Sequence, residues 1–152
     1  MTTATTLLSR VGRFYVRAEG TIDKLQSLAA LAIRLYLARV FIASALTKLH
    51  DWNITLALFE NEYHVPLLSP AAAALLGTAA EVGLPALLVV GLGTRLAALA
   101  LFAFNFVAAI SYPDLSDAGL KDHVLWGVLM LVLAVYGPGR ISIDNWLARR
   151  GN

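Results

Sequence analysis

The chain has 152 residues, of which 59% are hydrophobic and 14% are charged, and its mean hydropathy is +0.70. This composition excludes a soluble globular domain, and a net charge of only +2 excludes a disordered chain, which needs low hydrophobicity and a strong charge imbalance. The lack of cysteine excludes disulfides and thiolate-bound metals or iron–sulfur clusters. The basic residues form no single stripe, so we expect no nucleic-acid partner.

Four apolar segments are long enough to cross a lipid bilayer, which takes about 20 residues of helix. They comprise residues 28–47, 71–90, 96–112 and 120–136. The segments are rich in Ala and Leu and lack the two-residue alternation of strands. The sequence therefore predicts an all-α fold: an integral membrane four-helix bundle in a lipid bilayer, with interfacial N- and C-terminal segments.

The basic residues that flank these segments indicate their orientation, because cytoplasmic flanks retain Lys and Arg during insertion. The residues concerned precede the first segment, lie in the connection between the second and third, or follow the fourth: Arg10, Arg13, Arg17, Lys24, Arg95, Arg140, Arg149 and Arg150. The two other connections hold Lys48 and Lys121 among several acidic residues. We therefore expect both termini to lie in the cytoplasm.

Three stretches outside the spans also carry apolar side chains at helical spacing. Residues 1–27 form a basic amphipathic segment that suits a helix lying on the inner leaflet, or alternatively a frayed tail. In the connection 51–69 we expect a half-submerged helix that covers the outer face of the bundle. Gly137-Pro138-Gly139 should end the last span, and the residues after it, up to the basic tail 148–152, predict a second interfacial segment.

Charged side chains inside the spans each need a partner or a purpose, because insertion costs at least about 2.5 kcal/mol for each. Arg34 and Arg39 lie in the first span and Glu81 lies near the centre of the second. Counted from the span ends, Arg39, Glu81 and Asn105 reach nearly the same depth. Arg34 lies about 140° around the helix from Arg39, and we expect it to extend toward the cytoplasmic head groups.

This layer of Arg39, Glu81 and Asn105 has two interpretations. In the first, Arg39 and Glu81 form a structural ion pair that fixes the helix register, assisted by Asn105. In the second, the layer lines a cavity for a polar head group, and Glu81 is a catalytic proton carrier, because a desolvated carboxyl close to an Arg can exchange a proton.

The outer ends of the spans hold further candidate binding residues. Lys48 and His123 would form the rim of a head-group site that opens outward. The three histidines, His50, His64 and His123, all fall on this side with acidic neighbours, a composition that can coordinate a divalent metal. No two of them have ligand spacing on one helix, so we predict no metal site.

Several short motifs, in this order, resemble the DoxX family of small four-helix bacterial membrane proteins. The motifs are Arg34-Leu-Tyr-Leu-Ala-Arg39, Leu46-Thr-Lys48-Leu, Glu81 in a helix rich in Ala and Gly, Gly91-Leu-Gly-Thr-Arg95, and Gly137-Pro-Gly-Arg-Ile-Ser-Ile-Asp144. The resemblance covers residues 28–147. The stretch that begins Phe59-Glu-Asn-Glu-Tyr-His is similar to a proteobacterial subgroup whose genes often neighbour those for synthesis of metal-responsive modified peptides.

The resemblance implies a multi-pass protein of the bacterial inner membrane and leaves its reaction open. Family members include a subunit of quinol oxidase and of thiosulfate:quinone oxidoreductase. We therefore expect a quinone-linked subunit or accessory of a membrane oxidoreductase complex, with quinone as the cofactor and the redox centres on a protein partner, because the chain has no redox centre of its own. The alternative is a non-enzymatic scaffold or transport accessory for maturation or export of a modified peptide. The sequence leaves the oligomeric state open.

Overall fold

The computed structural model describes the backbone of residues 2–151 and the side-chain burial at residues 20, 22 and 25–151. Within this part of the chain all regular structure is helical. The helices are α1 (Thr2–His50), α2 (Trp52–Asn61), α3 (Pro70–Val90), α4 (Thr94–Ser111), α5 (Asp117–Tyr136) and α6 (Ile143–Arg150). The predicted all-α class is confirmed.

Four of the described helices are long and apolar enough to span a membrane: Leu25–His50 within α1, and the whole of α3, α4 and α5. Each contains one of the segments predicted from hydropathy, apart from Tyr112 at the end of the third. The protein is therefore a multi-pass membrane protein that lies in a lipid bilayer. The expected helix in the connection 51–69 is present as α2, and the segment after Gly139, which we expect to be interfacial, contains α6.

Capping residues set the ends of the spans. Ser69 precedes α3 and accepts a hydrogen bond from the backbone N–H of Ala72, while Pro70 occupies the first turn, where no donor is needed. Ser116 caps α5 in the same way. Gly91 ends α3 in a left-handed conformation with φ of 70°, which glycine adopts without steric cost.

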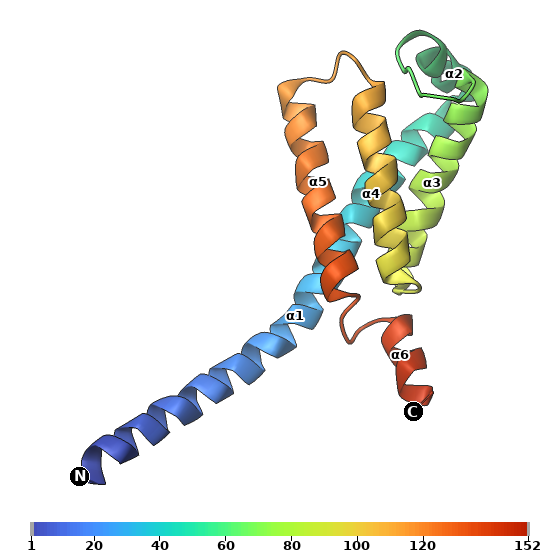
Figure 1. Cartoon of the computed structure of the whole chain (residues 1–152). Coiled ribbons are helices and arrows are strands. Elements are labelled where there is room, and N and C mark those ends of the chain that lie inside the picture. The colour runs from blue at the N-terminus through green and yellow to red at the C-terminus, as the bar shows by residue number, and fades with distance from the viewer. Residues whose placement is uncertain (1, 152) are drawn as a thin grey trace.

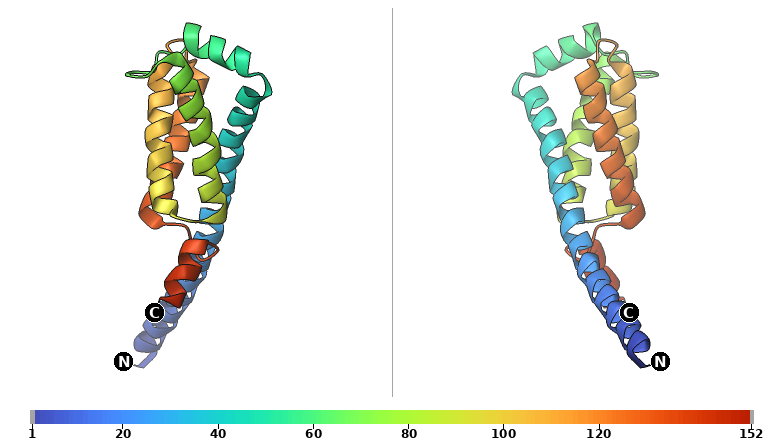
Figure 2. Two further views of the ribbon diagram at one scale, coloured as in Figure 1. Left: turned by 90° about the vertical axis from the view of Figure 1, so that its right-hand side faces the viewer. Right: turned by 90° about the vertical axis from the view of Figure 1, so that its left-hand side faces the viewer.

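The helices pack in the order α1, α3, α4, α5, with each contacting the next. Both termini lie at one end of the molecule and α2 lies across the other end (Figures 1 and 2). We call these the terminus-side end and the α2 end. The core between the spans consists of fully buried apolar side chains, among them Leu37, Leu88, Leu101, Met130 and Leu133.

The N-terminal half of α1 projects away from the bundle as a continuation of the first span (Figure 1). The backbone of residues 2–24 is thus part of one 49-residue helix and makes no separate helix. The side chains predicted to contact lipid there, at residues 7–17, lie outside those that the structure describes.

Arg34 joins three segments at the terminus-side end. Its guanidinium donates to the carbonyls of Leu88 and Val89, the latter at 2.7 Å, and also to those of Pro138 at 3.0 Å and Ile141 at 2.6 Å. The side chain is 1% exposed, so the expectation that it extends toward the head groups is wrong. The last carbonyls of a helix have no partner within the helix, and Arg34 supplies donors to them at the end of α3.

Asp144 completes this junction, which we call the terminus-side latch: Arg34, Gly91, Asp144 and the loop 137–142. The Asp144 carboxylate accepts from the backbone N–H groups of Gly93 at 2.7 Å and Thr94 at 2.9 Å. It therefore caps the start of α4 from another part of the chain. A Cβ at Gly91 would lie 2.7 Å from the Arg34 guanidinium, so this close approach requires glycine. The latch gives a structural role to three of the sequence motifs, namely those that contain Arg34, Gly91 and Asp144.

Candidate functional site

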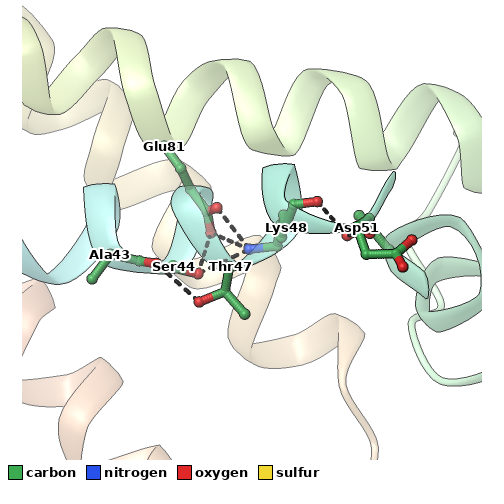
Figure 3. Close-up of polar contacts among 7 residues, drawn as sticks. Ala43, Ser44, Thr47, Lys48, Asp51 and Glu81 are labelled. Carbon is green, nitrogen blue, oxygen red and sulfur yellow. Dashed lines mark hydrogen bonds and ion pairs between the residues drawn. The ribbon is translucent and has the colours of Figure 1, made fainter. Parts of the chain in front are cut away.

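Glu81 of α3 forms an ion pair with Lys48 of α1 (Figure 3). The Lys48 ammonium lies 2.6 and 2.7 Å from the two carboxylate oxygens of Glu81. Ser44, one turn before Lys48, accepts from Lys48 at 2.9 Å and donates to Glu81 at 3.1 Å. The side chains of Lys48 and Glu81 are only 13% and 7% exposed. The pair therefore lies between two spans and is largely buried.

The sequence interpretation paired Glu81 with Arg39, and the structure corrects it. Arg39 is exposed on the outside of the bundle, because Arg34 is directed into the latch and Arg39 is turned about 140° away from it. Counting from the span ends gives the depth of Arg39 and Glu81 in the membrane. It does not give the direction in which each side chain points around its helix axis, and this direction decides which side chains meet. The long Lys48 side chain reaches Glu81 from one turn beyond Ser44.

A cavity of about 280 Å³ adjoins this pair, between the α2 ends of α1, α3 and α4 and beneath α2. We call it the Lys48–Glu81 cavity. Its walls are mostly apolar and include the phenyl rings of Phe59 in α2 and Phe104 in α4. Gly77 leaves room between these rings, since a Cβ there would lie 3.7 Å from Phe104 and 3.8 Å from Phe59. Such a mixture of apolar walls and few polar groups is typical of ligand sites.

Two further polar side chains line the Lys48–Glu81 cavity. The Ser111 hydroxyl has no hydrogen-bond partner among the described residues, although Ser111 is 1% exposed. Buried hydroxyls are nearly always paired, so this one is available to a ligand. Burial raises the pKa of the Tyr63 phenol, and the negative charge of Glu81 raises it further. The phenol therefore stays a neutral donor at physiological pH.

A stack of aromatic rings leads from the cavity toward the surface. The Phe59 and Tyr63 ring centroids are 4.8 Å apart, and those of Tyr63 and Tyr112 are 5.1 Å apart. The backbone N–H of His64 donates to the carbonyl of Ser111 at 2.8 Å and fixes the connection 62–69 over the end of α4. The cavity wall is thus shaped by aromatic surfaces that favour a flat ring.

Asn105 and His123 pair with each other and do not line the Lys48–Glu81 cavity. The Asn105 amide donates to the backbone carbonyl of His123 at 2.9 Å, and its oxygen lies 2.8 Å from His123 Nδ1. The His123 ring also packs edge-on against Trp126. Of the five candidate site residues, the structure therefore brings Lys48 and Glu81 together, pairs Asn105 with His123 elsewhere, and leaves Arg39 outside.

The sequence interpretation missed Ser44, Tyr63 and Ser111. Ser44 had a usable signal, because it lies one turn before Lys48 and hence on the same helix face. Tyr63 and Ser111 carried none, since their position depends on how the connection after α2 folds back. Among the described residues, no group of three or more His, Cys, Asp or Glu side chains can hold a metal ion.

These features define a four-span membrane protein with a ligand-sized cavity at a buried ion pair. The sequence model of the DoxX family matches residues 29–113, more than half of the chain, and the chain therefore belongs to that family. The match runs from the membrane part of α1 through α4. Neither the curated proteins nor the solved structures provide a significant match.

Proposed function

We propose that the protein binds the head group of a membrane quinone in the Lys48–Glu81 cavity and serves as a subunit of a membrane oxidoreductase. The observation that carries this proposal is the buried Lys48–Glu81 ion pair in the wall of a small, mostly apolar cavity, which is also lined by Ser111, whose buried hydroxyl has no partner among the described residues. A quinone matches this chemistry, because it is a flat ring with oxygens on opposite edges and an apolar tail that remains in lipid.

The cavity supplies the donors and the acceptor that a quinone needs. The Ser111 hydroxyl and the Tyr63 phenol are donors for the carbonyl oxygens of a quinone, and the Glu81 carboxylate is an acceptor for a quinol hydroxyl. Oxidation of a quinol to a quinone releases two electrons and two protons. The electrons would pass to a redox centre on a partner protein, and both protons would leave at the α2 end, one of them by way of Glu81.

The distribution of basic residues supports a location in the bacterial inner membrane with both termini in the cytoplasm. Arg95 belongs to the first turn of α4, Arg140 to the loop before α6, and Arg149 and Arg150 to α6. These segments lie at the terminus-side end (Figure 1), and cytoplasmic flanks are rich in such residues. In this orientation the Lys48–Glu81 cavity lies in the outer half of the membrane.

The test is to extract and quantify quinone from the purified protein, and to measure the shift in Tm caused by decylubiquinone and by the naphthoquinone menadione. Wild type should retain quinone and gain stability with at least one of these probes. Gly77→Ala adds a methyl group between Phe59 and Phe104 and should weaken binding. Gly83→Ala on the same helix is the matched control, because a Cβ there meets nothing within 4 Å. Both changes favour the helix by about 0.5–1 kcal/mol, so a loss of binding would not reflect unfolding.

A second pair of variants tests the hydroxyl itself. Ser111→Ala should weaken binding of the quinone probe several-fold while leaving the ligand-free protein equally or more stable, since a buried unpaired hydroxyl costs about 1–3 kcal/mol. Thr78→Val is the control, because the Thr78 hydroxyl is also buried without a partner but does not line the cavity. Absence of both retained quinone and a Tm shift would contradict the proposal, and co-purifying soluble proteins would then favour a scaffold function.

A further inference from the structure

A second cavity lies at the opposite end of the bundle, between α1 and α5. It has a volume of about 690 Å³. Its lining from α1 consists of Gln26, Ser27, Ala29, Ala30 and Ile33, and the rest comes from the end of α5 and the loop after it, between Val132 and Arg140. We call it the α1–α5 groove. The spanning part of α1 begins at Leu25 and α5 ends at Tyr136, so the groove lies at the level where a membrane leaflet passes from acyl chains to head groups.

The lining of the α1–α5 groove changes from apolar to polar toward the terminus-side end. Ile33 and Val132 line its apolar part, while Gln26, Tyr136 and Arg140 line its polar end. Arg140, Gln26 and Tyr136 are all exposed. An arginine beside a phenol and an amide is a set of donors suited to a phosphate group.

Contacts on either side hold the α1–α5 groove open. Trp126 Nε1 of α5 donates to the Tyr36 hydroxyl of α1 at 3.3 Å, which joins the two helices farther from the termini. At the terminus-side end, the backbone N–H of Arg140 donates to the Ser27 hydroxyl at 3.1 Å. The groove is therefore bounded by these two hydrogen bonds. In a bilayer its apolar part is filled by hydrocarbon, because an empty space there forfeits dispersion contacts.

We propose that the α1–α5 groove binds one phospholipid with an anionic head group from the leaflet at the terminus-side end. The acyl chain lies between α1 and α5 along Ile33 and Val132, and the phosphate contacts the Arg140 guanidinium with the Tyr136 hydroxyl and the Gln26 amide nearby. This binding site is separate from the Lys48–Glu81 cavity, and it stabilises the contact between α5 and α1.

The test compares phosphatidylglycerol with phosphatidylcholine of identical acyl chains, added to the full chain purified in neutral detergent. Native mass spectrometry and the Tm shift measure binding. Wild type should retain about one phosphatidylglycerol and bind it several-fold more tightly than phosphatidylcholine. Both lipids carry a phosphate that accepts from Arg140, but the choline ammonium of phosphatidylcholine repels the guanidinium. Arg140→Gln should abolish this preference. Arg149→Gln, an exposed arginine of α6 outside the groove, should retain it.

The apolar part of the groove has its own matched pair of variants. Ala29→Leu would fill the groove and should weaken binding of both lipids, whereas Ala32→Leu, exposed on α1 but outside the groove, should not. This pair decides the matter even if Arg140→Gln folds poorly. Equal binding of the two lipids by wild type, equal losses in both arginine variants, or the same Tm shift from inorganic phosphate alone would overturn the proposal.

Discussion

At the Lys48–Glu81 pair, each charge is stabilised chiefly by the other, because both side chains are largely buried. Ser44 adds hydrogen bonds to both partners, yet it carries no charge. Removal of one partner therefore leaves an uncompensated charge in a medium of low dielectric constant, which costs about 3–5 kcal/mol. This dependence distinguishes the pair from Arg39, which lies exposed on the same helix.

The first prediction is strong coupling between Lys48 and Glu81. Lys48→Met and Glu81→Gln should each lower the stability of the folded protein by about 3 kcal/mol, and the double variant should lose clearly less than the sum. Arg39→Met is the control and should have little effect. Thermal unfolding in detergent measures all four proteins, and additive losses would show that the two residues do not interact.

The second prediction concerns proton exchange at Glu81 and rests on the proposed function. Glu81→Gln keeps the size of the side chain and one acceptor oxygen but cannot take up a proton. The purified variant should retain quinone. Membranes that contain the variant should lose quinol-dependent electron transfer. Unchanged electron transfer in a folded Gln variant would assign the carboxyl a structural role only.

At the scale of the helices, the terminus-side latch links elements distant in sequence through charged side chains that contact backbone groups. Burial tends to raise the pKa of Asp144, but the N–H groups of Thr94 and Gly93 outweigh burial and hold the pKa below its ordinary value of 3.8. A carboxyl with a lowered pKa contributes stability that is complete above its unfolded pKa and is lost as pH falls through the folded pKa.

The third prediction follows from that sign. Asp144→Asn should lower Tm at pH 7, by an amount equivalent to about 1 kcal/mol for a lost helix cap. As the pH falls below about 4, wild type should lose this advantage, so that the two proteins converge. Asp114→Asn, a change in an exposed loop, is the control. A Tm difference that is the same at pH 7 and pH 3 would show that the carboxylate charge does not support the cap.

The limits of prediction from sequence are visible in individual elements. Hydropathy located all four spans because each is a long apolar run, and the spacing of Trp52, Leu56 and Phe59 located α2. Rotation about the helix axes could not be obtained in the same way. Arg34 and Arg39 are both arginines in the first span. Arg34 is nevertheless buried among carbonyls of α3 and the loop 137–142, whereas Arg39 is exposed.

At the scale of the whole molecule, the two ends of the bundle differ in how they are packed. The terminus-side end is closed by Arg34 and Asp144, which bind backbone groups. The α2 end holds the Lys48–Glu81 cavity. A ligand of the Lys48–Glu81 cavity would therefore enter near α2, and the side of the membrane that this end faces decides where any released proton goes.

The fourth prediction is that the α2 end faces away from the cytoplasm, because the arginines outside the spans are concentrated at the other end. The chain has no cysteine, so single cysteines provide unambiguous labels. Glu60→Cys and Ser116→Cys, both exposed near the α2 end, should react with a membrane-impermeant maleimide on intact cells or spheroplasts. Arg149→Cys should react only after the membrane is opened. Labelling of Arg149→Cys alone in intact cells would invert the orientation and direct protons from Glu81 toward the cytoplasm.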